Sequence, residues 1–196
     1  MQKIDKILIG THNNGKFIEI SDLLPKNVEK ISPINLGIES PIENGKTFEE
    51  NSEIKADFFC RNSNLVTLSD DSGLEIECLN GQPGIFSSRW ADELGGFDKA
   101  MIEILKKVKK INKGTKAQFV SSLTLKWPDG KKINTKGVIK GNVAKKRGKN
   151  GFGYDPIFIP DGYSKTFAEM DYVEKLQIDH RYIAYKKLYE KIKIYF

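Results

Sequence analysis

Extended and helical patterns alternate along the first part of this chain, and this alternation narrows the folds open to it. Residues 4–10 are typical of a buried strand, and a helical pattern runs from Asn14 to Leu24, just before Pro25. We expect a second strand over 28–34, a helix over 48–62 and a short strand over 65–68. Such alternation favours an α/β protein.

The second half of the chain adds a hairpin to this alternation. Extended segments over 117–127 and 131–140 flank the turn residues Pro128-Asp129-Gly130. A helix over 97–108, a short strand over 156–159 and a last helix over 182–194 complete the prediction. We therefore expect an α/β fold in which helices flank a central twisted mixed β-sheet.

The composition indicates a soluble enzyme or binding protein of ordinary size. The 196 residues suffice for one domain over 1–196, or two closely associated lobes, and 39% of them are hydrophobic. No window approaches the length of an apolar membrane span, so we expect no membrane partner. Cys60 and Cys78 lack the spacing of metal ligands, and we expect reduced thiols in a cytoplasmic protein.

The net charge of +6 is compatible with nucleic acid, an anionic surface or a small phosphate-rich ligand. Lysines over 106–110 follow the pattern of a solvated helix face, whereas those over 145–149 indicate an exposed loop. No recognised nucleic-acid-binding module accompanies the charge, so we expect no nucleic-acid partner. A basic nucleic-acid-binding protein that uses the 145–149 loop is the alternative from outside the enzymes.

Two adjacent carboxylates, Asp70 and Asp71, follow an apolar run and precede a predicted turn at Gly73. On an extended chain, neighbouring side chains point in opposite directions. One carboxylate could therefore face a metal ion while the other supports it. An ordinary surface turn explains the same residues, because Asp, Ser and Gly are common in turns.

The segment from Gly10 to Phe17 resembles a phosphate-binding loop with its last residue changed. A Walker A loop requires Ser or Thr after its lysine to bind Mg²⁺, and Phe17 cannot do so. The free N–H groups at the predicted helix start still favour an anion, and Lys16 adds a positive charge. A capped helix with a solvated lysine is the structural alternative.

The predicted helix over 48–62 begins with the pattern of a capping box, in which Thr47 is followed by Glu50. Glu43 lies shortly before this helix. Asn51 and Lys55 are four residues apart, so they share one helix face. A solvated helix face is the alternative reading of this polar set.

Two later segments carry residues that suit a nucleotide base. Glycines surround Phe152 in the segment 148–158, so the backbone can approach a ligand closely and the ring can stack on a base. Asp179 can cap the last helix and places His180 and Arg181 in its first turn. The helix dipole disfavours cations there, which indicates an anionic or carbonyl partner. Structural roles for the loop and for the histidine remain open.

Taken in order, these segments resemble the inosine triphosphate pyrophosphatase family, also called the Ham1-like family. The matching motifs extend from Thr11 to Ala184 and are Thr-His-Asn-x-Gly-Lys (11–16), Thr-Phe-Glu-Glu-Asn (47–51) with Lys55-Ala56, Asp-Asp-Ser-Gly-Leu (70–74), Gly-Gln-Pro-Gly-Ile-Phe-Ser (81–87), Gly-Phe-Gly-Tyr-Asp-Pro-Ile-Phe (151–158), Thr-Phe-Ala-Glu-Met (166–170), and Lys175 with His180-Arg181. Asp179 replaces a usual Ser and Ser52 a usual Ala, and we expect activity to survive both changes.

The resemblance implies a two-lobed fold with an active-site cleft between the lobes. It implies a hydrolase that cleaves noncanonical purine nucleoside triphosphates (ITP, dITP and XTP) to the monophosphate and pyrophosphate, and a homodimer. Mg²⁺ is the implied cofactor, with Asp71 and Glu43 as its ligands. Asp71, Asp70 and Lys55 are the implied catalytic residues.

The resemblance also implies how the substrate is held. Lys16, Lys55 and the amides after Thr11 would bind the triphosphate, and Phe152 would stack on the base. The implied substrate-binding residues are Thr11, His12, Asn13, Asn14, Gly15, Lys16, Ser72, Phe152, Gly153, Tyr154, Asp155, Lys175, His180 and Arg181. A P-loop-like NTPase or kinase is the rival enzyme, and its products would differ.

Overall fold

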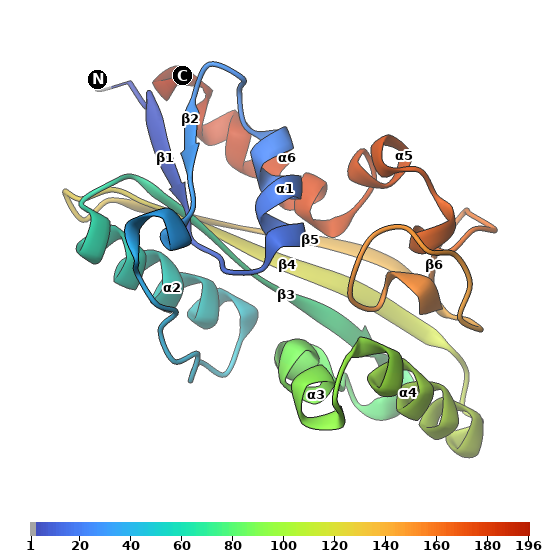
Figure 1. The fold of residues 1–196 in the computed structure, drawn as a ribbon. Coiled ribbons are helices and arrows are strands. Elements are labelled where there is room, and N and C mark those ends of the chain that lie inside the picture. The colour runs from blue at the N-terminus through green and yellow to red at the C-terminus, as the bar shows by residue number, and fades with distance from the viewer. Residues whose placement is uncertain (1–2) are drawn as a thin grey trace. The chain divides into compact units, whose positions relative to one another are not determined.

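The computed structural model describes residues 3–196 and contains one six-stranded sheet (Figure 1). Its strands are β1 (Lys6–Ile9), β2 (Glu29–Ile31), β3 (Thr67–Ile76), β4 (Lys116–Lys126), β5 (Lys132–Val143) and β6 (Phe158–Pro160), in the order β2-β1-β3-β4-β5-β6. β1 pairs in parallel with β2 and β3, whereas β5 and β6 are antiparallel. The predicted α/β fold with a mixed sheet is confirmed.

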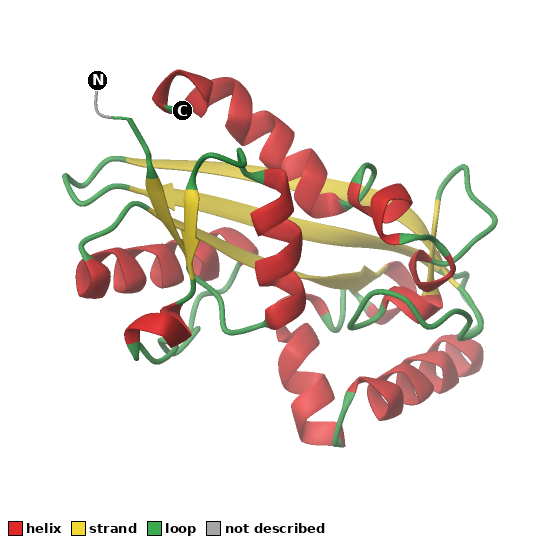
Figure 2. Ribbon diagram, turned by 45° about the horizontal axis from the view of Figure 1, so that its top comes forward, coloured by secondary structure: helices red, strands yellow, loops and turns green. Residues whose placement is uncertain are grey.

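Within residues 3–196, six α-helices accompany these strands (Figure 2). They are α1 (Asn14–Leu23), α2 (Phe48–Ser63), α3 (Ser87–Leu94), α4 (Phe97–Ile111), α5 (Tyr172–Leu176) and α6 (His180–Ile192). Sequence patterns predict α1, α2, α4 and α6 but not the short α3 and α5. None of the helices within residues 3–196 has the length and apolar character needed to cross a membrane.

The chain divides into two compact units, each assembled from separate segments. The first unit contains residues 3–71, Ser121–Gly137 and Arg181–Phe196, and the second contains Ser72–Val120 and Val138–His180. The chain passes from one unit to the other inside β3, β4 and β5, and again between His180 and Arg181 at the start of α6. Each unit has a hydrophobic core of its own.

The core of the first unit joins strands to α1 and α6. Ile7 and Leu68 from β1 and β3 are fully buried together with Ile20 of α1 and Leu188 of α6. Ala184, Leu188 and Ile192 recur every four residues, so α6 presents one apolar stripe. In Figure 1, α2 lies below the strands of this unit and α6 above them.

The core of the second unit is rich in aromatic side chains. Phe119 of β4 packs edge-on against Phe158 at a centroid distance of 4.8 Å, and Phe158 contacts Phe167 at 5.3 Å. Ile104 of α4 and Leu74 of β3 are fully buried in the same cluster. Aromatic pairs of this geometry add stability beyond the area that they bury.

The turn predicted at Gly73 is wrong. β3 continues to Ile76, so Ser72 and Gly73 lie inside a strand, and Gly73 is buried. β3 has a neighbouring strand on either side in the sheet. The pairing with β1 ends at Leu68, so it is the pairing with β4 that outweighs the local turn preference of the Asp-Ser-Gly sequence.

The strand predicted over 28–34 is too long. β2 ends at Ile31 because Ser32 caps a 3₁₀ turn over Pro33–Leu36. Its hydroxyl accepts a hydrogen bond from the Ile34 N–H at 3.2 Å. A proline lacks the N–H that a strand ladder requires, so it favours this exit from the sheet.

The start of α2 is only partly as predicted. The Thr47 hydroxyl accepts a hydrogen bond from the Glu50 N–H at 3.1 Å, which caps the helix. The Glu50 carboxylate accepts from the Lys46 N–H at 2.6 Å, one residue earlier than a capping box requires. Both cysteines, Cys60 and Cys78, are free thiols as expected.

Gly10 directly follows β1 and lies where the strands of the first unit pack closely against α2. A Cβ at this position would overlap the Ser69 hydroxyl and lie 2.7 Å from the Phe59 ring. We expect Gly10→Ala to lower the free energy of unfolding by about 1–3 kcal/mol, because overpacking strains a closed interior. Urea denaturation measures the change, and Lys26→Ala, at an exposed position, is the control with no expected effect. A fully stable Gly10→Ala variant would contradict this close packing.

Candidate functional site

Asp70 lies at the centre of a buried network of charges in the first unit. Its carboxylate is 0% exposed and accepts a hydrogen bond from the Ser121 hydroxyl at 2.6 Å. Lys16 Nζ lies 3.1 Å from Asp70 Oδ2, and Arg181 Nε lies 3.4 Å from the same atom. Glu19, also buried, binds Arg181 Nη1 at 2.5 Å. Two anions and two cations therefore compensate one another inside this unit.

The charges around Asp70 keep its carboxylate ionised. Burial alone would raise the pKa of Asp70, but the Lys16 and Arg181 cations and the Ser121 hydrogen bond lower it well below its usual range. The carboxylate is therefore available as a permanent anion. Arg181 thus lies with Asp70 and Glu19 in the first unit, and its role beside the base stays a prediction.

Asp71 belongs to a second polar group of the first unit, built on α2. Its Oδ1 lies 3.2 Å from Lys55 Nζ, and its Oδ2 accepts a hydrogen bond from Asn51 Nδ2 at 3.2 Å. Glu43 Oε1 lies 3.0 Å from the same ammonium. The Asn51 side-chain oxygen accepts from the Gly45 N–H at 2.8 Å, which ties the loop after Glu43 to the helix. Asn51 and Lys55 meet Asp71 because they share one helix face.

Lys55 and Asp71 have shifted pKa values. Burial alone would lower the pKa of Lys55, but the Asp71, Glu43 and Asp70 carboxylates together raise it. Burial raises the pKa of Asp71, against the charges of Lys55 and Lys16, and the Glu43 and Asp70 carboxylates raise it further. The pKa values of the two adjacent aspartates thus shift in opposite directions. Asp70 stays ionised, whereas Asp71 accepts a proton more readily.

The turn between β1 and α1 ends in a helix cap at Asn13. The Asn13 side chain accepts a hydrogen bond from the Lys16 N–H at 3.0 Å, and the Asn13 N–H donates to the Thr11 hydroxyl at 3.1 Å. His12 is exposed, and its Nδ1 lies 2.6 Å from the Ser40 hydroxyl. The remaining residues of this predicted set form the first positions of the helix: Asn14 and Gly15. The open helix start is a suitable place for an anion.

The glycine-flanked loop of the second unit contains a buried ion pair beneath an aromatic ring. Lys175 Nζ lies 2.6 Å from Asp155 Oδ2 and 4.8 Å from the centre of the Phe152 ring. The Phe152 N–H donates to the same carboxylate oxygen at 2.9 Å. Gly151 has a φ of +72°, and a Cβ there would overlap the Asp155 carboxylate, so the close turn requires glycine. Asp155 thereby fixes both the ring and the ammonium.

The other predicted residues of the second unit support the same region. The Tyr154 hydroxyl donates to the Ser87 carbonyl at 2.9 Å, and burial raises the Tyr154 pKa. Gly153, beside it, has a φ of +64°. The His180 ring stacks on Phe119 at 4.9 Å. The last of the set, Ser72, follows Asp71 directly in β3.

Sequence reasoning missed three residues that hold these groups in place. Glu19, Asn51 and Ser121 are buried and contact predicted site residues, yet none was assigned to the site. Only Asn51 carried a local signal, which was its spacing from Lys55. Glu19 and Ser121 meet their partners through contacts distant in sequence.

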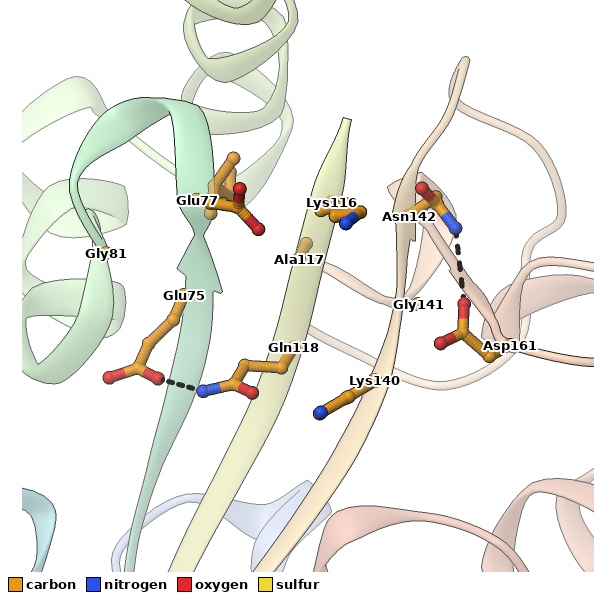
Figure 3. Close-up of a pocket in the computed structure, with 11 residues that line it drawn as sticks. Glu75, Glu77, Gly81, Lys116, Ala117, Gln118, Lys140, Gly141, Asn142 and Asp161 are labelled. Carbon is orange, nitrogen blue, oxygen red and sulfur yellow. Dashed lines mark hydrogen bonds between the residues drawn. The ribbon is translucent and has the colours of Figure 1, made fainter. Parts of the chain in front are cut away.

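A separate pocket of about 510 Å³ lies on the sheet of the second unit (Figure 3). Two hydrogen bonds join residues that line it. Gln118 Nε2 donates to Glu75 Oε2 at 2.7 Å, and Asn142 Nδ2 donates to Asp161 Oδ1 at 3.3 Å. None of the predicted site residues lines this pocket. Among residues 3–196, no group of three or more His, Cys, Asp or Glu side chains is arranged to hold a metal ion.

The basic loop over 145–149 has partners within the second unit. Lys146 Nζ lies 2.8 Å from Asp98 Oδ1. Arg147 Nη2 donates to the Ser164 carbonyl at 3.0 Å and lies 3.3 Å from the Glu169 carboxylate. These pairs neutralise part of the charge that a nucleic-acid surface would use.

Comparison with known proteins gives one consistent result. The sequence model of the Ham1 family matches residues 7–191. A dITP/XTP pyrophosphatase of Zymomonas mobilis subsp. mobilis is 43% identical to the chain, with 93% of this chain and 90% of that protein covered. A dITP/XTP pyrophosphatase of Agrobacterium fabrum is 41% identical, with coverage of 97% and 98%.

Solved structures agree with the sequence comparison. A HAM1 protein from Coxiella burnetii superposes with a TM-score of 0.86 at 32% identity, covering 99% of this chain and 100% of that one. The Ham1 protein of Staphylococcus aureus gives a TM-score of 0.85 at 34% identity, with coverage of 96% and 98%.

The network around Asp70 predicts a pH-dependent loss of stability. We expect Asp70→Asn to lower the free energy of unfolding by about 3–5 kcal/mol near neutral pH, because it removes the anion that pairs with the buried Arg181 and the partly buried Lys16. The folded pKa of Asp70 is depressed, so its stabilisation is complete above about pH 4 and declines as the pH falls further. Urea denaturation at several pH values should show the wild type and the variant converging in acid.

Asp98→Asn is the matched control, because the Asp98 side chain is 75% exposed and pairs with Lys146 at the surface. Its effect should stay below about 1 kcal/mol. An Asp70→Asn variant no less stable than Asp98→Asn would contradict the central position of Asp70.

Proposed function

The chain belongs to the Ham1 family, and on this basis we propose that it hydrolyses noncanonical purine nucleoside triphosphates, namely ITP, dITP and XTP, to the monophosphate and pyrophosphate. The observation that carries the proposal is the buried Asp71 carboxylate, held by Asn51 and Lys55 beside Glu43. Two relatives described as dITP/XTP pyrophosphatases over nearly the whole chain support the substrate class.

Glu43 and Asp71 suit a magnesium ion. Their carboxylates both lie within 3.2 Å of one ammonium group, Lys55 Nζ, so they already converge on a point of positive charge. Mg²⁺ usually binds one or two carboxylates and completes its shell with water and substrate phosphates. Bound there, the ion would neutralise negative charge on the triphosphate.

The first unit supplies the groups that bind the triphosphate. Lys16 and Lys55 are cations on α1 and α2, and the N–H groups at the start of α1 favour an anion. Ser72, the first residue of the second unit, follows Asp71 in β3 and is the proposed hydroxyl donor to a phosphate. Phosphoryl transfer depends mainly on positioning and on charge neutralisation, and these groups provide both.

Asp71 is the group that orients the attacking water and takes its proton. The water oxygen forms the new bond to the α-phosphorus, and the bond to the bridging oxygen of the β-phosphate breaks. The Asp71 carboxylate is the general base of this proposed step, a role that aspartates commonly fill. Lys55 stays charged and holds the oxygen that does not receive the proton.

The Phe152 loop is the proposed base site. Phe152 stacks on the purine, and Asp155, Lys175 and His180 frame the base, with Gly153 and Tyr154 shaping the loop. Inosine and xanthine have a carbonyl acceptor at position 6, whereas adenine has an amino donor. A protein donor left unpaired by adenine would cost about 1–3 kcal/mol, which favours ITP over ATP.

The remaining expectations follow from family membership and composition. The chain passes between its two units inside three strands, which supports a single pyrophosphatase domain over 1–196. The two free thiols support a reducing, cytoplasmic location. We propose a homodimer on the basis of the family resemblance.

The products distinguish this function from its rivals. We expect ITP, dITP and XTP, incubated with the enzyme and Mg²⁺, to release pyrophosphate faster than ATP or GTP. Orthophosphate is measured with and without added inorganic pyrophosphatase. The difference between the two measurements gives the pyrophosphate that the enzyme releases. Orthophosphate or a nucleoside diphosphate as the first product would favour a P-loop-like NTPase instead.

Asp71→Asn tests the catalytic carboxylate. We expect the loss of ITP hydrolysis by at least about a hundredfold, because general-base catalysis alone contributes that much. Far-ultraviolet circular dichroism should show an intact fold, and Asp98→Asn should keep full turnover. Near-normal pyrophosphate release by Asp71→Asn would remove Asp71 from the mechanism.

Phe152→Leu tests the stacking surface. Leucine keeps an apolar side chain but removes the aromatic face, and stacking contributes about 1–3 kcal/mol per base. We expect KM for ITP to rise about five- to a hundredfold, with a smaller effect on kcat. Phe86→Leu, at a half-exposed phenylalanine of the same unit, is the matched control. An unchanged KM in Phe152→Leu would exclude Phe152 as the base platform.

A further inference from the structure

Glu19 is a buried carboxylate to which the mechanism above gives no part. It lies on α1, one helical turn after Lys16, and only 3% of its surface is exposed. Its Oε2 lies 2.5 Å from Arg181 Nη1. A buried carboxylate is costly unless it is paired, so this contact fixes the guanidinium firmly.

Arg181 and Lys16 both contact the same oxygen of Asp70, but at different distances. Lys16 Nζ lies 3.1 Å from Asp70 Oδ2, whereas Arg181 Nε lies 3.4 Å from it, at the outer limit of a hydrogen bond. The closest partner of the guanidinium is Glu19. Glu19 therefore holds Arg181 toward itself, and Lys16 is left as the nearer cation of Asp70.

Lys16 is the cation of this network that can move. The Lys16 side chain retains 16% of its exposure, whereas those of Arg181 and Glu19 retain 3% each. A lysine ammonium on a flexible stem can exchange one anion for another, but a guanidinium between two buried carboxylates cannot do so easily. A triphosphate at the start of α1 must therefore compete with Asp70 for Lys16.

We propose that Glu19 is a positioning residue for Lys16, which acts through Arg181 and Asp70 and keeps the ammonium on Asp70 until a triphosphate binds. This inference rests on the proposed function, because it takes Lys16 as a phosphate ligand. Without the Glu19 charge, the guanidinium keeps its contact with Asp70, whose Oδ2 lies 3.4 Å from Arg181 Nε. Arg181 then binds Asp70 more closely, and Lys16 is released before any ligand arrives.

Chemical labelling tests the release of Lys16 without any substrate. Ligand-free wild type and Glu19→Gln are acetylated with light and heavy acetic anhydride, and mass spectrometry compares the Lys16 peptides. We expect Lys16 to react about two- to tenfold faster in Glu19→Gln, which corresponds to the loss of one modest ion pair. Lys26, exposed just beyond the same helix, should react equally in both proteins.

Steady-state kinetics with Mg²⁺ and ITP tests the consequence for binding. We expect Glu19→Gln to lower KM about two- to tenfold with kcat little changed, since the triphosphate no longer displaces Asp70 from Lys16. A merely structural lesion would raise KM or lower kcat. Asp22→Asn removes a charge from an exposed position of α1 and is the matched control.

A double variant shows whether Glu19 acts through Lys16. In the Lys16→Met background, Glu19→Gln should leave KM unchanged, because there is no ammonium to release. If Glu19→Gln does not fold, Glu19→Asp, which keeps the charge but withdraws it from the guanidinium, is expected to show the same changes to a smaller extent. Thermal unfolding establishes that each variant is folded at the assay temperature.

The outcomes separate this inference from the proposed function. Unchanged Lys16 labelling in folded Glu19→Gln, with pyrophosphate still released from ITP, would overturn the positioning role alone. Faster labelling together with a lower KM that disappears in the Lys16→Met background would support it. Faster labelling with no effect of Lys16→Met on KM would overturn both the inference and the phosphate role of Lys16.

Discussion

The buried carboxylate of Asp70 is the interaction around which the first unit is organised. It contacts Lys16 at the start of α1, Arg181 at the start of α6 and Ser121 on β4. Three elements far apart in sequence thus meet at one anion. Because the charges inside this network balance, a fully buried ion is tolerated there, and it holds β3 in the position that also presents Asp71.

Adjacent positions on β3 give the two aspartates different chemistry. The sequence suggests a metal-facing and a supporting carboxylate, and the structure supplies the physical difference between them. Asp70 has two cations and a hydroxyl donor, which hold its pKa low. Burial and two neighbouring carboxylates raise the pKa of Asp71. Strand alternation separates their surroundings, so one side chain stabilises the unit while the other is suited to catalysis.

Local signals predicted much of the fold and less of the site. The start of α1 at Asn14, the apolar stripe of α6 and the hairpin turn at Pro128-Asp129-Gly130 depend on neighbours in sequence, and these predictions are correct. The turn at Gly73 was wrong because pairing with β4 overrode local preference. Glu19 carried no signal in the sequence, since its partner Arg181 lies 162 positions later.

The division of the chain into interleaved segments has a consequence for how such a protein can change over evolutionary time. Each unit is assembled from two or three stretches of chain, and the passages between units lie inside β3, β4 and β5 and at the start of α6 rather than in linkers. No single recombination event between genes can replace one unit and spare the other. The groups proposed for the base all lie in the segment Val138–His180, but this segment shares its hydrophobic core with Ser72–Val120, so an exchanged base site must still fit a core that it does not carry.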